Sequence, residues 1–398
     1  MHLSQPLELP CGARLPNRIA KAAMSEQLAR SDGHPGRGLE RLYHRWARGG
    51  AGLIITGNVM IDPSHRESHM NAVLTRDSDL APFRRWAAAG RGAPLWMQIN
   101  HTGRQCPRHM NPRPMAPSEV ESVAMFRSIK AFGRPRAMSE AEIEAVIARF
   151  ATTARLAKEA GFDGVQIHGA HGYLVSQFLS PRTNRREDAW GGSLEGRARF
   201  LREVVRAVRG VVGGRFPVGV KLNSADFQRG GFAEGESMQV LGMLEAEGVD
   251  LIEISGGNYE SKAMFNLDAD QREDREAYFL DYARRARRAT QVPLMVTGGF
   301  RSAAAMEGAL AEGALDVVGM ARPFANNPDI ARDLIEGRLE RALPPVRLPL
   351  LYTASVASEA MLSVAQMSVM ARGVDPNGVL GPFLTAILGI LGLGRRVS

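Results

Sequence analysis

Eight short apolar runs recur along the chain, and each is followed by a stretch in which apolar residues repeat at helical spacing. The runs cover residues 18–24, 52–57, 94–99, 164–169, 217–223, 249–255, 293–299 and 315–321. Runs that are apolar on both faces are typical of parallel strands covered by helices. Eight strand–helix units favour an α/β fold of the closed (β/α)8 TIM-barrel type over an open doubly wound sheet, which usually has fewer strands.

The stretch 139–161 shows the helical signals most clearly. Ser139 and Glu142 have the spacing of a capping box, apolar residues then repeat on one face, and Gly161 follows as a stop signal. We therefore predict a long helix immediately before the fourth strand.

The barrel is expected to occupy residues 1–343, with a Pro- and Arg-rich insertion over residues 101–138, after the third strand. We expect this insertion to form a lid or hairpin beside the site. Residues 344–398 are predicted to be a C-terminal helical extension that packs on the barrel or on a partner subunit, which leaves homo-oligomerisation open. Because its apolar stretch 379–394 is short for a membrane span and contains Pro382, we expect a docking helix and no stable membrane insertion.

The formal net charge is +8, and a basic balance attracts the phosphates of nucleic acids or of nucleotide cofactors. The arginine-rich stretch 282–291 has no aromatic residues interleaved with its arginines, so we predict a solvated helix face and no nucleic-acid partner. With only two cysteines, neither a disulfide framework nor a cysteine-ligated iron–sulfur cluster is expected. The N-terminal residues have no apolar core of signal-peptide length, so we expect a cytoplasmic location.

Polar and small residues stand at the carboxyl ends of the predicted strands, where barrels of this type carry their chemistry. They are Ser25, Gly57, Gln98, His168 with His171 and Tyr173, Lys221, Gly298 with Gly299, and Arg322. The loops after the seventh and eighth strands commonly bind a phosphate through backbone N–H groups and a helix N-terminus. The segments TGGFRS and GMARPFANNPD follow those strands and fit that role.

Several longer motifs follow one another along residues 7–337. They are NRIAKAAMSE, YHRWARGGAGLIITG, QINHTGRQ, IHGAHGYLVSQFLSP with a following TN–R–D–GGS pattern, and VGVKLNSADF. In these motifs the chain resembles the old yellow enzyme family of FMN-dependent ene-reductases. The loop after His171 is the most specific of them, because its pattern has no general structural cause. The resemblance implies a TIM barrel, non-covalently bound FMN and NAD(P)H as the hydride donor.

The resemblance also assigns the flavin to several strand ends. Ser25 aligns with the residue that hydrogen-bonds flavin O4, and Gln98 with the amide that reads the pyrimidine ring. Lys221 stands where the family usually has Arg, beside flavin N1 and O2, so the reduction potential is expected to differ from that of typical members. The implied cofactor-binding set is Ala23, Met24, Ser25, Gly57, Gln98, Lys221, Gly299, Phe300, Ala321 and Arg322, of which the last four would hold the phosphate.

Three residues match the family's catalytic positions. His168 and His171 correspond to the pair that binds the carbonyl oxygen of an activated alkene, where two N–H donors stabilise developing negative charge. Tyr173 corresponds to the acid that protonates the α-carbon after hydride has reached the β-carbon. The implied function is reduction of enones, enals and similar small-molecule alkenes by FMN and NAD(P)H.

A metal site is the competing interpretation of the HxxH spacing. Such pairs usually lie on a helix at i, i+4 with a carboxylate nearby, whereas His168 ends a strand, so we predict no catalytic metal. Glu26 follows Ser25 where some bacterial members have an aromatic residue that shapes the substrate pocket, which leaves substrate preference open.

Two other functions remain open at this point. A tRNA-dihydrouridine-synthase-like flavin barrel would also bind FMN and carry positive charge, but it needs a cysteine acid, and Cys106 lies in the insertion after the third strand. A non-catalytic flavin-binding protein is disfavoured because His168, His171 and Tyr173 are all present. A yellow protein that is bleached by NADPH would show an active flavin. Reoxidation by cyclohexenone or by tRNA would then separate an ene-reductase from a tRNA-dihydrouridine-synthase-like enzyme.

Overall fold

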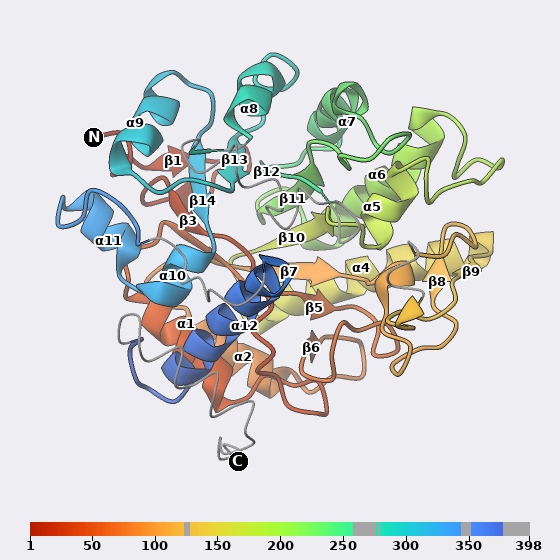
Figure 1. Cartoon of the computed structure of the whole chain (residues 1–398), viewed down its shortest axis with the longest axis horizontal. Helices are drawn as coiled ribbons and strands as arrows, with labels where there is room; N and C mark the ends of the chain where they lie inside the picture. The colour runs from red at the N-terminus through yellow and green to blue at the C-terminus, as the bar shows by residue number, and fades with distance from the viewer. Residues whose placement is uncertain (123–127, 258–275, 278, 344–351, 377–398) are drawn as a thin grey trace.

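The computed structural model describes residues 1–122, 128–257, 276–277, 279–343 and 352–376 of the chain (Figure 1). Eight parallel strands pair in the order β10-β11-β12-β13-β14-β3-β4-β7, and β7 pairs again with β10, so the sheet closes into a barrel. Their bounds are β3 Ile19–Lys21, β4 Leu53–Ile55, β7 Leu95–Asn100, β10 Gly164–Gly169, β11 Val218–Asn223, β12 Leu251–Ser255, β13 Leu294–Thr297 and β14 Val317–Met320. The predicted (β/α)8 TIM barrel is confirmed, and each barrel strand lies within one of the eight apolar runs or extends one residue beyond it.

Helices cover the outside of the barrel (Figure 1). They are α1 Arg37–Ala47, α2 Leu80–Ala89, α4 Glu140–Ala160, α5 Leu174–Leu179, α6 Leu194–Val212, α7 Glu234–Ala246, α8 Leu280–Ala286, α9 Ala303–Ala311, α10 Arg322–Asn326, α11 Ile330–Ile335 and α12 Tyr352–Ala371. Helix α4 begins at the predicted capping box, in which Ser139 and Glu142 exchange hydrogen bonds, and ends at Gly161 in a left-handed conformation. The helix predicted before the fourth strand is confirmed.

Two separate hydrophobic cores follow from the alternation of side chains along each strand. The larger core fills the space between strands and helices and includes Trp46 and Trp86. The smaller core closes the barrel floor: Trp96, Leu251 and Met295 meet inside the barrel, and β1 (Leu7–Glu8) and β2 (Arg14–Leu15) cover them from below. Because side chains alternate, the residue two positions after Trp96 points into the barrel one layer higher, and that layer is polar.

Two insertions lengthen the barrel mouth. The expected one after β7 contains the 3-10 turn η1 (Gly103–Gln105) and the strands β8 (Met115–Ala116) and β9 (Arg136–Ala137). A lid or hairpin was expected here; β8 and β9 pair in parallel, while an isolated antiparallel bridge joins Pro107 to Phe132. The second insertion, which the sequence did not suggest, follows β4 and carries β5 (Val59–Met60) and β6 (Ala72–Val73), with β5 paired to the end of β7.

Helix α12 lies against α1 and α10, with Met367 and Met370 buried. Arg45 of α1 binds Asp375, just beyond α12, at 2.7 Å, so a charge contact adds to the apolar packing. The division between a barrel at 1–343 and an extension at 344–398 stays a prediction. The apolar stretch 379–394 lies outside the described residues. Among the helices that the structure describes, none is both long and apolar enough to cross a membrane.

Candidate functional site

A buried polar network fills the layer above the barrel floor. Gln98 Nε2 donates to Gln166 Oε1 at 2.7 Å, Gln166 Nε2 donates to Glu253 Oε2 at 2.8 Å, and Lys221 Nζ lies 2.9 Å from Glu253 Oε1. Strand register produces this arrangement, because Gln98 is opposite Gln166 and Lys221 is opposite Glu253. The predicted Gln98 and Lys221 are therefore joined through two residues, Gln166 and Glu253, that the sequence analysis did not single out.

His168, His171 and Tyr173 come together at the end of β10. The imidazole centroids are 5.1 Å apart, and the Tyr173 ring lies 4.8 Å from that of His168. His171 takes a left-handed conformation (φ +61°), and Gly172 follows with φ +78°, so a tight turn brings Tyr173 back toward the strand end. The structure thus brings these three side chains together, and their catalytic roles stay a prediction.

Both imidazoles are held in the neutral form. Burial lowers the pKa of His168 and His171 well below the usual value, and the positive charge of Lys221 lowers both further. The Nδ1 of His168 accepts the N–H of Ala170 at 3.2 Å, which leaves the proton on Nε2. His171 Nε2 lies 2.8 Å from Ser255 Oγ. Each neutral ring carries one N–H group: in His168 it is on Nε2, and in His171 the tautomer decides whether Nε2 donates to Ser255 Oγ or accepts from it.

A carboxyl group from the second insertion joins this cluster. Glu67 accepts a hydrogen bond from the Tyr173 hydroxyl, and Ser25 Oγ donates to Glu67 Oε2 at 2.8 Å. Burial raises the pKa of Glu67, against hydrogen bonds from Ser25, Asn71 and Asn58 that lower it. Glu67 thereby connects two residues that the sequence had placed in different roles, and no motif marked it in advance.

A cavity of about 210 Å3 opens at the ends of β13 and β14. Its lining includes the residues predicted for a phosphate, Gly299, Phe300, Ala321 and Arg322. Gly298 (φ +131°) and Gly299 (φ +83°) have backbone conformations that side-chain-bearing residues rarely adopt, so bare backbone faces the cavity. The hydroxyl of Thr297, on its wall, is buried without a hydrogen-bond partner among the described residues.

The remaining predicted positions lie near Ser25. Ala23 and Met24 follow β3 and are partly exposed. Gly57 is buried, and its N–H donates to Glu26 at 2.8 Å. A Cβ at Gly57 would lie 2.2 Å from a Glu26 oxygen, so the contact with Glu26 is one reason for glycine here. Glu26 also accepts from the hydroxyl of Tyr43 on α1 and is 7% exposed, so its carboxyl group is buried between the strand ends and that helix.

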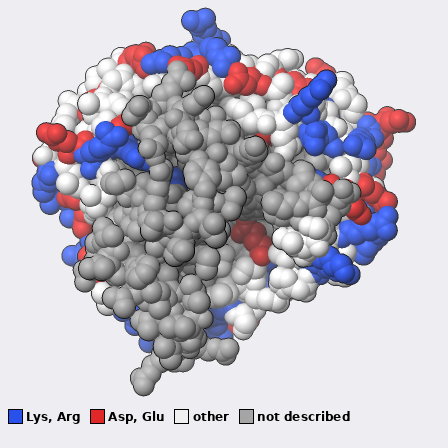
Figure 2. Space-filling model, in the orientation of Figure 1, with Lys and Arg blue, Asp and Glu red and all other residues white. Residues whose placement is uncertain are grey.

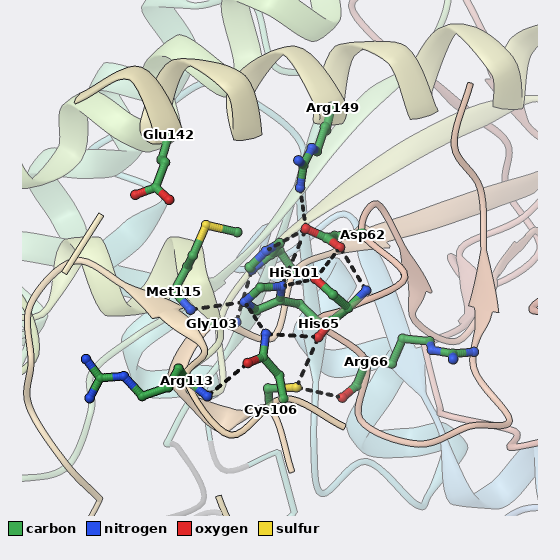
Figure 3. A network of polar contacts seen from close by, with 12 residues as sticks. Asp62, His65, Arg66, His101, Gly103, Cys106, Arg113, Met115, Glu142 and Arg149 are labelled. Carbon is green, nitrogen blue, oxygen red and sulfur yellow. Dashed lines mark hydrogen bonds and ion pairs between the residues drawn. The ribbon is translucent and has the colours of Figure 1, made fainter. Parts of the chain in front are cut away.

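Asp62, His65 and His101 form a second buried group beside the first insertion (Figure 3). Their ligand-type atoms lie within 4.8 Å of one another, as a metal site requires. However, His65 Nε2 accepts the N–H of Met115 at 3.0 Å and His101 Nδ1 accepts the N–H of Gly103 at 3.1 Å.

An imidazole that binds a metal through one nitrogen carries its proton on the other. Both outer nitrogens here are acceptors, so the protons lie on the nitrogens that face Asp62. Burial alone would raise the pKa of Asp62, but His65 and His101 lower it. Arg149 supplies the positive charge that pairs with this carboxylate. This group is a hydrogen-bonded anchor between α4 and the two insertions.

Comparison with known proteins identifies the family. A model of the NADH:flavin oxidoreductase / NADH oxidase family matches residues 2–341. The chain belongs to this family. It is 42% identical over 353 residues to the NADH-dependent flavin oxidoreductase iliE of Hypocrea jecorina, covering 82% of this chain and 87% of that protein. It is 36% identical to the NADH oxidase of Thermoanaerobacter brockii over 81% of this chain, but spans only 49% of that protein.

Comparison with solved structures leads to the same family. Morphinone reductase superposes with a TM-score of 0.73 and 28% identity, covering 86% of this chain and 91% of that one. A 2-naphthoyl-CoA reductase complex gives a TM-score of 0.79 and 27% identity, covering 86% of this chain and 53% of that one. The resemblance to old yellow enzymes is therefore confirmed: the protein is an enzyme, an FMN-dependent oxidoreductase that uses NAD(P)H as hydride donor.

The residues at the barrel mouth suit both the phosphate and the ring system of FMN. The cavity at β13 and β14 offers bare glycine backbone, an unpartnered Thr297 hydroxyl and the guanidinium-bearing Arg322, a suitable set for a phosphate. The barrel mouth offers amide and ammonium groups at Gln98 and Lys221, which suit a heterocycle with donor and acceptor edges.

Proposed function

We propose that the protein reduces activated C=C bonds of small molecules such as enones and enals. The observation that carries this proposal is the convergence of two neutral imidazoles and one phenol at the end of β10. His168 and His171 would each donate an N–H to the substrate's carbonyl oxygen, which becomes more negative as the β-carbon accepts hydride. Tyr173 would give its hydroxyl proton to the α-carbon.

The same proposal assigns the cofactor-binding residues. When bound, FMN supplies hydride transfer, taking the hydride from NAD(P)H and delivering it to the alkene. Ser25, Gln98 and Lys221 would orient its ring system, with Ala23, Met24 and Gly57 alongside. Gly299, Phe300, Ala321 and Arg322 would hold its phosphate through backbone N–H groups and a guanidinium. The protein's own contribution is then to position the reactants and to donate hydrogen bonds and one proton.

A tRNA-dihydrouridine-synthase-like activity receives less support. Cys106, the acid that such an enzyme would need, is buried, and its thiol faces the carbonyl oxygens of Ser64 and Arg66. Burial raises the pKa of this thiol to about 11.

The arginine-rich stretch also has local acidic partners: Arg284 pairs with Asp281, Arg285 with Glu234 and Arg287 with Asp316. Figure 2 shows Lys and Arg mixed with Asp and Glu around the described rim of this face. These pairs offset part of the positive charge that would attract a nucleic acid, so we do not propose a nucleic-acid substrate. A cytoplasmic location and the oligomeric state stay predictions.

The direct test uses the purified holoenzyme under anaerobic conditions. FMN is first reduced with NADH or NADPH, and the reduced protein is then mixed with cyclohexenone or with tRNA. We expect rapid reoxidation and cyclohexanone formation with the enone only. Reoxidation by tRNA with dihydrouridine formation, or a failure to reduce any activated alkene while quinones are reduced, would contradict the proposal.

A further inference from the structure

The insertion between β4 and α2 delivers one carboxyl group to the catalytic cluster. Glu67 lies in the segment that joins β5 to β6, and its Oε1 accepts from the hydroxyl of Tyr173, 106 residues further along the chain. Tyr173 itself is 2% exposed. The phenol that must lose and regain a proton in each turnover is therefore in hydrogen-bond contact with an ionisable group.

The carboxyl group is fixed in place by side chains on both of its oxygens. Asn58 Nδ2 donates to Oε1 at 2.7 Å, while Ser25 Oγ and Asn71 Nδ2 donate to Oε2 at 2.8 and 3.3 Å. Asn71 Oδ1 accepts the backbone N–H of Glu67 and of Ser68, both at 2.9 Å, so the amide orientation of Asn71 is determined by its neighbours. Within the part of the chain that the structure describes, no cation pairs with Glu67, and its hydrogen-bond donors are neutral.

We propose that Glu67 is the proton relay that restores the phenol of Tyr173 after each turnover. This proposal builds on the proposed role of Tyr173 as the acid. When the phenol gives its proton to the α-carbon of the alkene, a C–H bond forms and a phenolate remains. The carboxylic acid of Glu67 then gives its proton to the phenolate oxygen, and the resulting carboxylate is reprotonated by hydronium or a buffer acid, which supplies the one proton that the overall reduction consumes.

The surroundings raise the pKa of Glu67 above that of a free carboxyl group, which brings its proton exchange closer to the working pH of a relay. Burial and the negative charge of Glu26 raise the pKa of Glu67, whereas the donors Ser25, Asn71 and Asn58 lower it, and the net direction is upward. The titratable groups that face it are Glu26, from the turn after β3, and Tyr173, with the neutral His168 behind the phenol.

The test compares the Glu67→Gln holoenzyme with the wild type in single and in multiple turnovers of cyclohexenone. Tyr173 begins each single turnover already protonated, so reoxidation of reduced FMN should stay within roughly threefold of the wild-type rate. Multiple turnovers need the relay and should slow by about 10- to 100-fold, with partial rescue by added small carboxylic acids such as acetic acid. Glu247→Gln, which removes a carboxylate paired with Arg202 and Arg206 on the outer surface, is the matched control.

A second readout does not depend on turnover or on any alkene. Infrared difference spectra across a pH titration of the wild-type holoenzyme should contain a carboxylic-acid carbonyl band that is absent from Glu67→Gln. In Tyr173→Phe, where Glu67 is native but its phenol partner is gone, that band should shift. This keeps the proposal testable if Glu67→Gln fails to hold FMN, and it separates failure of the relay from failure of alkene reduction.

Each outcome decides the question. Equal slowing of single and multiple turnovers, without rescue by acids, would show that Glu67 only supports the geometry of Tyr173. A wild-type steady-state rate in Glu67→Gln, or a carbonyl band that is unchanged in Tyr173→Phe, would overturn the proposal. Slow multiple turnover with acid rescue and a shifted band would support it.

Discussion

The two sides of the barrel mouth are built in different ways. At β13 and β14, the cavity wall includes the backbone of Gly298 and Gly299, which have conformations that favour glycine. At β7 to β12, side chains fill the barrel and touch one another from Gln98 to Lys221. A phosphate needs N–H groups and charge at a fixed place, whereas proton and hydride chemistry needs groups whose protonation is set by their neighbours. Substitutions on the two sides should therefore affect different quantities.

The largest effect is expected on the side-chain side, at Tyr173. Tyr173→Phe keeps the ring and its packing against His168 but removes the proton donor. Reoxidation of reduced FMN by cyclohexenone should slow by about 10²- to 10⁴-fold, while reduction by NAD(P)H should keep its rate. Stopped-flow measurement of the two half-reactions checks this. Equal slowing of both would mean that Tyr173 is structural, and an unchanged enone rate would assign the proton to another donor.

Removal of the imidazoles should have the next largest effect. His168→Ala combined with His171→Ala takes away both proposed N–H donors to the substrate oxygen and should slow enone reduction by roughly 10²- to 10³-fold. Binding of phenols, which resemble the enolate, should weaken in parallel while FMN is retained. Charge-transfer absorbance of a bound phenol at wild-type affinity would show that these rings do not hold the oxygen.

The share of the site that could be predicted from the sequence differs between the two sides of the barrel mouth. The strands were predictable because each is a buried, two-sided apolar run, and the cavity residues because Gly-rich loops after the last two strands have a general role. Gln166 and Glu253 have the same strand parity as His168 and Lys221, so alternation could have identified them once the barrel was assumed. Glu67 could not have been found this way, because the insertion that carries it has no period and reaches Tyr173 only through the fold.

A substitution on the backbone side should change cofactor affinity and leave the chemistry intact. Gly299→Ala places a side chain at a left-handed φ of +83°, at a cost of about 1–2 kcal/mol. If the free protein relieves this strain by moving the loop, FMN must restore the strained conformation, so its binding should weaken by roughly 5- to 30-fold. In FMN-saturated protein, the enone half-reaction should keep its rate. Gly214→Ala is the matched control, because an added Cβ there has no atom within 4 Å. A slowed half-reaction at saturating FMN would remove the distinction between the two sides.

A smaller shift is expected in the reduction potential of the bound flavin. Glu253→Gln leaves the charge of Lys221 uncompensated and should raise the potential, whereas Lys221→Met leaves Glu253 alone and should lower it. Each shift should be on the order of 30 mV, about 1.4 kcal/mol for a two-electron couple. The double variant should return toward the wild-type value. Spectroelectrochemistry that shows three unchanged potentials with FMN fully bound would place this ion pair away from the flavin.

The smallest expected effect is that of removing metal ions. Prolonged treatment with a chelator should leave both half-reactions and the thermal stability unchanged. The reason is that His65 and His101 use their outer nitrogens to accept the N–H groups of Met115 and Gly103, so these rings are not set up to bind a metal. A metal bound between these rings and Asp62 would require both outer nitrogens to become donors and would break both backbone contacts. Elemental analysis that finds one tightly held metal ion per chain, together with a lower melting temperature after chelation, would show that this group of residues is a metal site, and the anchor role would then belong to the metal.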